Sequence, residues 1–203
     1  MKVLLIGNSS INSTKKVGNQ IDNDFDLVAR MNRFELEGYQ QYLGSRTDIW
    51  IINRMISLGR SNVHYGNLQT KFEERKKTSP TLNNMLMMTY LKNENDFNEV
   101  KKQTEKYSDF EVGNTLKVSR YLKSEWDKRM TDKFYKPATG LTSIHYLIEE
   151  YDNLTIHNFD CGKTKHYWGD TDKASEPMSS KHNWSFDEIL ISELVDNGKV
   201  KYL

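Results

Sequence analysis

Val3-Leu4-Leu5-Ile6-Gly7-Asn8-Ser9-Ser10 lies at the start of the chain and predicts the class of its fold. Four consecutive aliphatic residues that end at Gly-Asn-Ser are typical of a strand buried on both faces of a parallel sheet. Two further apolar runs, Leu27-Val28-Ala29-Arg30-Met31 and Asp48-Ile49-Trp50-Ile51-Ile52, have the same character. Because the polar segments between these runs are too short for long helices, we expect an α/β fold with a mostly parallel sheet.

The C-terminal part of the chain continues this pattern. Residues 141–151 have the apolar spacing of a helix, and residues 154–157 and 200–202 have the composition of strands. Ser185-Phe186-Asp187-Glu188 has the pattern of a capping box, which predicts that the last helix opens there and closes at Gly198. Since the chain contains no repeat and no low-complexity linker, we expect a single domain over all 203 residues.

The middle of the chain, residues 82–130, differs from the rest in being strongly charged. Met85, Met88 and Leu91 recur there at helical spacing. We therefore expect a central helical insertion. Its methionines are expected to fill a core, because methionine packs irregular gaps far more often than it builds a metal or cofactor site.

Charge balance and cysteine content exclude several classes of protein. The chain carries 29 Lys and Arg against 28 Asp and Glu, so no overall positive field favours a nucleic-acid partner. The one cysteine, Cys161, cannot form an internal disulfide, and no apolar run approaches the ~20 residues of a transmembrane segment. The apolar part of residues 1–7 is too short for a signal peptide, and we expect a cytoplasmic protein.

Short polar segments stand at the edges of the apolar runs. Gly7 would let a ligand approach the backbone closely, and Asn8 offers hydrogen-bond donors and acceptors, although an ordinary turn explains this segment equally well. Asn32, at the end of another run, could likewise simply cap a turn. Together with Gly44-Ser45-Arg46-Thr47-Asp48, these segments indicate loops that bind a phosphorylated sugar donor, because the carboxyl ends of parallel strands open onto one crevice.

Pro137-Ala138-Thr139-Gly140 leads into a predicted helix. The free N–H groups of a helix N-terminus, with the hydroxyl of Thr139 nearby, form a natural site for a phosphate group. A plain helix start explains the same residues equally well.

Two histidines are the candidate catalytic groups. His166 lies beside Tyr167 and Trp168 in a polar segment, 160–180, whose length is typical of a functional loop or of disorder. A protonated His166 could donate to a phosphate oxygen, and His182 could act as a general base, because imidazole titrates near neutral pH. Each histidine alone is more often a surface or structural residue. The scattered histidines and the single cysteine offer no compact zinc site.

In this order, the segments resemble the four sialylmotifs of the eukaryotic-type sialyltransferases, glycosyltransferase family 29. The long motif is carried by Ile6-Gly7-Asn8-Ser9, Asp22, Asp26-Leu27-Val28-Ala29-Arg30-Met31-Asn32, Gly38-Tyr39 and Leu43-Gly44-Ser45-Arg46-Thr47-Asp48. The short, third and very short motifs are similar to Lys136-Pro137-Ala138-Thr139-Gly140, to His166-Tyr167-Trp168, and to His182 with Phe186-Asp187-Glu188. Each motif is weak alone, but four in the correct order are specific as a set.

The resemblance implies a single Rossmann-like domain of the GT-A-variant type that acts without a metal or another cofactor. Its donor would be CMP-sialic acid, and the sugar would move to a hydroxyl of a glycan acceptor with inversion at the anomeric carbon. We expect the segment 160–180 to order as a lid when the donor binds.

The resemblance also implies roles for individual residues. Donor binding is assigned to Asn8, Ser9, Asn32, Thr139 and Gly140. His166 would stabilise the departing CMP phosphate, because a cationic donor aimed at developing charge lowers the barrier. His182 would deprotonate the acceptor hydroxyl.

Three features depart from the family pattern. Animal members join the long and short motifs by a disulfide, for which Cys161 has no partner, and they carry a membrane anchor and stem, which we do not expect for this protein. Both departures fit a compact, soluble bacterial or viral member. Ala138 stands where Ser or Thr is usual, so one hydroxyl contact to the nucleotide is lost.

Other functions stay open at this point. The donor could be CMP-Kdo or another CMP-nonulosonate, and a non-catalytic protein that binds CMP-sugars would keep the donor loops but tolerate the loss of His182. A serine hydrolase with Ser9 or Ser10 as nucleophile needs an acid before its histidine, which Ser179-Ser180-Lys181 does not supply. An α/β protein of unrelated role in a phage or a capsule locus is the remaining alternative.

Overall fold

A computed structural model gives the fold and describes residues 1–12, 14–53, 68–88, 91–104, 110–131, 137–164, 166–167 and 182–203. Within these ranges, seven strands form one sheet in which every pairing is parallel. The strands are β1 (Lys2–Ile6), β2 (Leu27–Met31), β3 (Ile49–Ile52), β4 (Asn84–Met87), β5 (Phe110–Val112), β6 (Asn153–His157) and β7 (Val200–Tyr202). The predicted α/β class is confirmed, as are the strands expected from the apolar runs.

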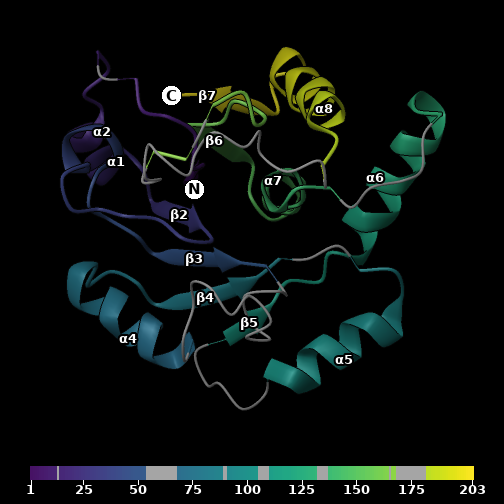
Figure 1. Ribbon diagram of the computed structural model, residues 1–203, viewed down its shortest axis with the longest axis horizontal. Helices are drawn as coiled ribbons and strands as arrows, with labels where there is room; N and C mark the ends of the chain where they lie inside the picture. The colour runs from purple at the N-terminus through teal and green to yellow at the C-terminus, as the bar shows by residue number, and fades with distance from the viewer. Residues whose placement is uncertain are drawn as a thin grey trace.

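Helices cover both faces of the sheet. They are α1 (Gly18–Asp24), α2 (Gln40–Leu43), α4 (Leu68–Thr78), α5 (Glu94–Thr104), α6 (Leu116–Arg129), α7 (Thr139–Glu150) and α8 (Trp184–Asp196). Figure 1 shows α1, α2 and α4 on one side of the sheet and α6, α7 and α8 on the other. Among the described residues, no helix is both long enough and apolar enough to cross a lipid bilayer.

β1 is buried on both faces, as its continuous apolar sequence predicts. Val3 and Leu5 pack into the cluster that side chains of α6, α7 and α8 complete. Leu4 and Ile6 point the other way, into a cluster with Ile21 of α1 and Leu43 of α2. Because alternate side chains of a strand face opposite sides, only a run without polar interruptions can fill both cores.

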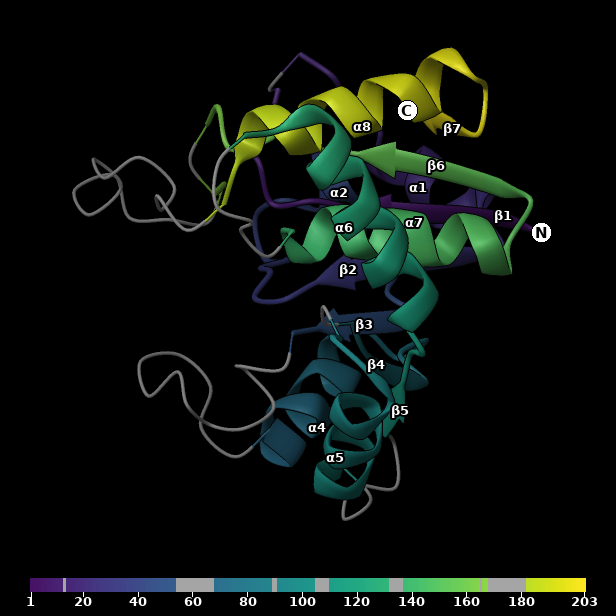
Figure 2. The ribbon, with the colours of Figure 1, turned by 90° about the vertical axis from the view of Figure 1, so that its right-hand side faces the viewer.

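The strand order places a topological switch point next to β1. The order is β5-β4-β3-β2-β1-β6-β7, so the chain adds strands on one side of β1 and then crosses to its other side with β6. Ligand sites of open parallel sheets lie where such a reversal opens a crevice at the carboxyl ends of the strands. Figure 2 shows these strand ends and the start of α8 on the same side of the molecule.

The middle of the chain differs from the expected helical insertion. Residues 82–130 contain α5 and α6, but they also contribute β4 and β5, which extend the sheet beside β3. Met85 lies in β4 and Met88 follows it, so their spacing of three is not helical. The four consecutive apolar residues 85–88 fit a strand buried on both faces better than a helix, which needs only one apolar face. Met85 and Met88 are fully buried, which confirms their predicted place in the core.

The last helix begins earlier than the capping box predicted. Asn183 is its N-cap, because the Asn183 side chain accepts a hydrogen bond of 3.0 Å from the backbone N–H of Phe186. Ser185 is exposed and lies within the first turn. Asparagine caps a helix as well as serine does, and the backbone geometry decided between the two candidates. The predicted end near Gly198 is confirmed, with a left-handed φ of 69° at that residue.

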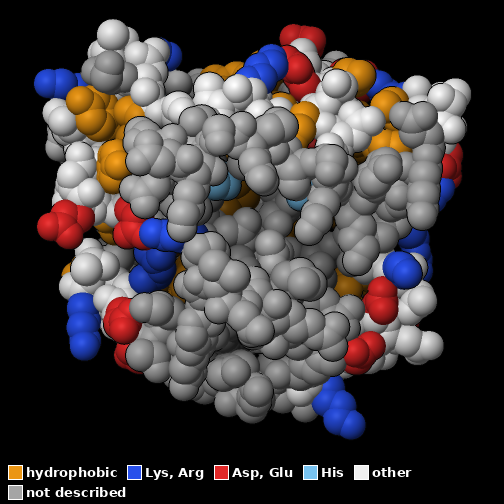
Figure 3. Space-filling view, in the orientation of Figure 1, with side chains coloured by type: hydrophobic (Ala, Val, Ile, Leu, Met, Phe, Trp, Pro, Cys, Tyr) orange, Lys and Arg blue, Asp and Glu red, His pale blue; other side chains and the backbone are white. Residues whose placement is uncertain are grey.

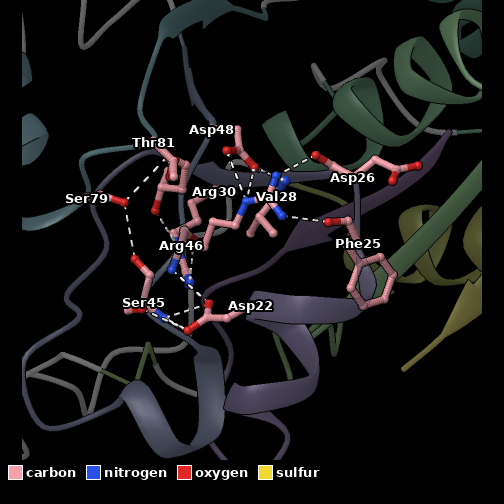
Figure 4. A network of polar contacts seen from close by, with 11 residues as sticks. Asp22, Phe25, Asp26, Val28, Arg30, Ser45, Arg46, Asp48, Ser79 and Thr81 are labelled. Atoms are coloured by element: carbon pink, nitrogen blue, oxygen red, sulfur yellow. Dashed lines mark hydrogen bonds and ion pairs between the residues drawn. The ribbon is translucent and has the colours of Figure 1, made fainter.

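The segment 44–48 lies at the amino edge of the sheet, away from the switch point. The Asp22 carboxylate accepts hydrogen bonds from the backbone N–H groups of Ser45 (2.9 Å) and Arg46 (2.8 Å). The buried Arg30 donates to the Leu43 carbonyl at 2.6 Å. Figure 4 shows the contacts of Asp22 with Ser45 and Arg46, within a larger polar network that includes Arg30. The expectation that 44–48 forms a donor-binding loop is therefore wrong: it precedes β3, whereas ligands meet the ends of strands.

Candidate active site

A cavity of about 270 Å³ opens at the carboxyl edge of the sheet, between the ends of β1, β2 and β6 and the starts of α7 and α8. All seven residues that the sequence proposed for the site line it: Asn8, Ser9, Asn32, Thr139, Gly140, His166 and His182. The volume is close to that of small ligand pockets. Figure 3 shows histidine surface, in pale blue, on this face of the molecule.

The ends of β1 and β6 are held together by their backbones. The N–H of Gly7 donates to the carbonyl of His157 at 2.8 Å, and the N–H of Ser9 donates to the carbonyl of Asn158 at 3.2 Å. A Cβ at Gly7 would lie only 2.4 Å from the carbonyl oxygen of Asn158. Glycine is required here because no side chain fits between the two strand ends.

Asn8 and Ser9 are oriented by hydrogen bonds on opposite sides of the cavity. The Asn8 side chain donates to the carbonyl of Met31, at the end of β2, over 3.1 Å. The Ser9 hydroxyl donates to the Asp160 carboxylate at 2.8 Å. A serine nucleophile needs a base such as histidine to take its proton, so this pairing with a carboxylate disfavours the hydrolase alternative.

Asn32 turns the chain away from the end of β2. Its φ is 50°, a left-handed conformation that asparagine tolerates better than most residues. The carbonyl of Asn32 accepts a hydrogen bond of 2.6 Å from the indole of Trp50, and its side-chain oxygen accepts one of 3.3 Å from the N–H of Asn53. The conformation of Asn32 is thus held from the side of β3.

The start of α7 borders the cavity. Its N-cap is Ala138, which has no side chain able to cap the first backbone N–H groups, and Thr139 is its first residue. A Cβ at Gly140 would lie 2.9 Å from the ring of Phe159, so glycine lets α7 approach the segment after β6 closely. The helix lacks a capping hydroxyl because Ala138 occupies the motif position at which Ser or Thr was expected.

Asp187 is an acidic residue of the cavity that was absent from the expected site residues. Only 4% of its surface is exposed, and burial raises the pKa of its carboxyl to about 7, opposed by a hydrogen bond from the N–H of Ala138. Asp187 thereby joins the first turn of α8 to the start of α7. The sequence placed it in a motif but offered no sign that it would be buried.

His166 is held by the backbone after β1. Its Nδ1 lies 3.1 Å from the carbonyl oxygen of Asn8. Because a carbonyl can only accept, Nδ1 must carry the proton, which leaves Nε2 as the titrating nitrogen. Burial lowers the pKa of His166 below its ordinary value. Trp168 and the residues 168–180 of the predicted lid lie outside the described residues.

His182 stands directly before the N-cap of α8, closer to the helix than the sequence suggested. Its ring centroid lies 5.2 Å from that of Trp184, with the planes inclined by 57°. Both residues line the cavity. The short distance to a capped helix start gives His182 a fixed place at the edge of the site.

The charges around the cavity are unusual for a site that is expected to take a phosphate. Among the described residues that line it, neither lysine nor arginine occurs, and His166 and His182 are the side chains able to become cationic. Two carboxylates, Asp160 and Asp187, are also present. No group of three or more potential metal ligands gathers within the described part of the chain.

The segment after β6 supplies residues that sequence reasoning missed. Asn158 has a φ of 61°, and its side chain donates to the carbonyl of Ser9 at 2.5 Å. Asp160 accepts hydrogen bonds from the N–H groups of Gly162 (3.1 Å) and Thr164 (2.7 Å), which make the segment turn tightly, and from the Ser9 hydroxyl, which ties it to the end of β1. Their position at the end of a predicted strand was the available signal, but only the strand order places β6 beside β1.

Comparisons with known proteins agree with this geometry. The model of glycosyltransferase family 29 (sialyltransferase) matches residues 3–199. No curated protein sequence matched the chain.

Solved structures of sialyltransferases share the fold. A mammalian sialyltransferase in complex with Gal-beta-1-3GalNAc-ortho-nitrophenol is 18% identical, with a TM-score of 0.60 over 100% of this chain and 68% of the other. The sialyltransferase CstII from Campylobacter jejuni, in complex with the substrate analogue CMP-3FNeuAc, is 17% identical, with a TM-score of 0.65 over 100% of this chain and 81% of the other. At such identities the similarity shows the shared fold.

Proposed function

The chain belongs to glycosyltransferase family 29, the sialyltransferases, and from this membership we propose that it transfers sialic acid from CMP-sialic acid to a hydroxyl of a glycan. The observation that carries the proposal is the convergence of five separate segments on one cavity, at residues 7–9, 32, 138–141, 166 and 182. The fold similarity to CstII, whose structure holds a CMP-sugar analogue, supports the choice of donor.

The donor phosphate is proposed to lie near His166 and the end of β1. The imidazole keeps a proton on Nδ1 through the carbonyl of Asn8, so a second proton on Nε2 would make it a cationic donor. Burial disfavours that charge in the free protein, and the negative charge of the arriving phosphodiester favours it. His166 is thus proposed to bind the second proton together with the donor, and to stabilise the charge on CMP as the glycosidic bond breaks.

The nucleoside is proposed to lie across Asn32 and the start of α7. Asn32 ends β2, and Thr139 and Gly140 open the helix with N–H groups that no side chain of the N-cap residue satisfies. Such groups carry the positive end of the helix dipole and suit the ribose-phosphate part of a nucleotide. Ser9 offers a hydroxyl oxygen as an acceptor, because its proton is donated to Asp160.

His182 is proposed to be the general base. A neutral imidazole takes the proton of the acceptor hydroxyl as its oxygen attacks the anomeric carbon, while the bond to the phosphate oxygen breaks and CMP leaves with the electron pair. One displacement of this kind inverts the anomeric carbon. A positioned base typically contributes ~10²–10⁴-fold to the rate.

The reaction is also proposed to proceed without a metal ion. His166 and the amide groups at the start of α7 would supply the positive potential that the leaving phosphate needs. A CMP-nonulosonate other than CMP-sialic acid would use the same residues, since none of them is specific to one nine-carbon sugar.

Calorimetric titration with CMP, in the presence of EDTA, tests the donor half of the proposal. We expect CMP to bind and UMP, GMP and AMP to bind much more weakly. Transfer from CMP-sialic acid to a panel of glycans, again in EDTA, then tests the reaction. If CMP and CMP-sialic acid both fail to bind, the proposed donor is wrong. If both bind but no acceptor is modified, the alternative of a non-catalytic CMP-sugar-binding protein gains support.

A further inference from the structure

Tyr167 is anchored by hydrogen bonds to two distant segments of the chain, residues 35–39 and the end of β1. Its hydroxyl donates to the carbonyl of Glu35 at 2.8 Å and accepts from the N–H of the same residue at 3.0 Å. Its own carbonyl accepts from the Tyr39 hydroxyl at 3.1 Å, and the two rings meet edge to face with centroids 4.9 Å apart. Burial raises the pKa of Tyr167 to about 12, so its hydroxyl stays protonated and can serve both contacts with Glu35.

The same anchor continues into His166. The N–H of Tyr167 donates to the carbonyl of Asn8 at 3.2 Å, and the same carbonyl accepts a hydrogen bond from Nδ1 of His166 at 3.1 Å. The backbone and the imidazole of adjacent residues therefore share one acceptor. If the Tyr167 side chain moved, the peptide between His166 and Tyr167 would move with it, and the Nδ1 contact would lengthen.

We propose that Tyr167 is a positioning residue that, through its hydroxyl contacts with Glu35, fixes the place and the tautomer of the His166 imidazole. The proposal rests on the proposed function, in which His166 faces the leaving phosphate. Tyr167 does not line the donor cavity, so its effect on the reaction passes through His166. Hydrogen bonds to a backbone carbonyl are a common way in which proteins select one histidine tautomer.

The hydroxyl can be separated from the aromatic ring by one substitution. Tyr167→Phe keeps the ring packed on Tyr39 and removes both contacts with Glu35. Tyr121→Phe is the matched control, because Tyr121 is 43% exposed on α6 and lies outside the cavity. Both variants keep a ring of the same size, so differences between them report on the Glu35 contacts.

Two measurements on these variants test the proposal. In steady-state transfer assays with CMP-sialic acid, Tyr167→Phe is expected to lower kcat by roughly tenfold to a hundredfold, with a much smaller change in the donor KM, because a small misplacement of a catalytic group costs that much. In ¹⁵N NMR spectra of the free protein, above the pKa of His166, wild type is expected to show the Nδ1-protonated tautomer. Tyr167→Phe is expected to show a mixture of both tautomers, and Tyr121→Phe should match wild type in both measurements.

The outcomes are distinct. An unchanged kcat or an unchanged tautomer in Tyr167→Phe overturns the proposal, as does a loss of melting temperature with the His166 signals unaltered. A wild-type protein that neither binds CMP nor transfers sugar contradicts the proposed function instead. In that case the NMR spectra still decide whether Tyr167 holds His166.

Discussion

The carbonyl oxygen of Asn8 lies 3.1 Å from Nδ1 of His166, although the two residues are 158 positions apart in the chain. The contact joins the first strand end to a segment that follows the sixth strand. It leaves Nε2 of His166 as the nitrogen that can bind or release a proton. The charge state of the proposed phosphate site therefore depends on one histidine whose orientation is set by the backbone.

Proton uptake by His166 predicts how CMP binding responds to pH. Burial lowers the pKa of His166 in the free protein, and a bound phosphate should raise it, so affinity for CMP falls as pH rises through the pKa of the complex. The affinity of the wild type should drop by up to about tenfold per pH unit in that range. His166→Gln should show a flatter dependence in calorimetry between about pH 6 and about pH 8. The phosphate's own titration is common to both proteins, so equal slopes would contradict the prediction.

His182 should be needed for turnover and dispensable for donor binding. His182→Asn is expected to lower kcat by about 10²–10⁴-fold, because the acceptor hydroxyl loses its base. Calorimetric affinity for CMP should stay close to that of wild type. Ser185→Ala, an exposed change three residues further along, is the control and should retain both properties. A large loss of CMP affinity in His182→Asn would assign His182 to the donor site instead.

Asp22 should matter for stability and not for the ligand. Its carboxylate accepts from the N–H groups of Ser45 and Arg46 and from the Ser45 hydroxyl, all at the amino edge of the sheet. Asp22→Ala should lower the free energy of unfolding by about 1–3 kcal/mol, the usual loss when such groups are left unpaired. Asp24→Ala, on the exposed side of α1, should cost much less. Urea denaturation and CMP titration of both variants would check this, and a CMP affinity that falls with Asp22→Ala would refute it.

Asp187 predicts a loss of stability at higher pH. Its pKa is raised from 3.8 to about 7 in the folded protein, so between these values the folded state holds a proton that the unfolded state has released. The free energy of unfolding therefore falls as pH rises through this window, by up to ~1.4 kcal/mol per pH unit from this one group, and the contribution is lost above the folded pKa.

Asp187→Asn removes this titration and keeps an oxygen that can accept from the N–H of Ala138. The stability of Asp187→Asn relative to wild type should therefore increase between about pH 5 and about pH 8 in denaturant titrations. Other titrating groups cancel in the comparison. Parallel stability profiles would mean that Asp187 is ionised throughout.

Much of the fold could be predicted because buried parallel strands have a distinctive sequence. The uninterrupted apolar runs before Gly7 and through Ile49–Ile52 are typical of strands that are buried on both faces of a parallel sheet. The run around Met85 was misassigned, because a spacing of three between methionines is compatible with a helix until the neighbouring strand is known. Short apolar segments are ambiguous for this reason, and pairing with β3 decided the outcome.

The sequence by itself determined the family, the strands β1, β2, β3, β6 and β7, and the seven residues that meet in the cavity, because these depend on local composition and on motifs in a fixed order. Only the tertiary structure decided which loops face the ligand. It sent 44–48 to the amino edge, brought Asp160 to Ser9, and buried Asp187 against the start of α7. These contacts join residues far apart in the chain, and the order of strands in the sheet determines which of them can meet.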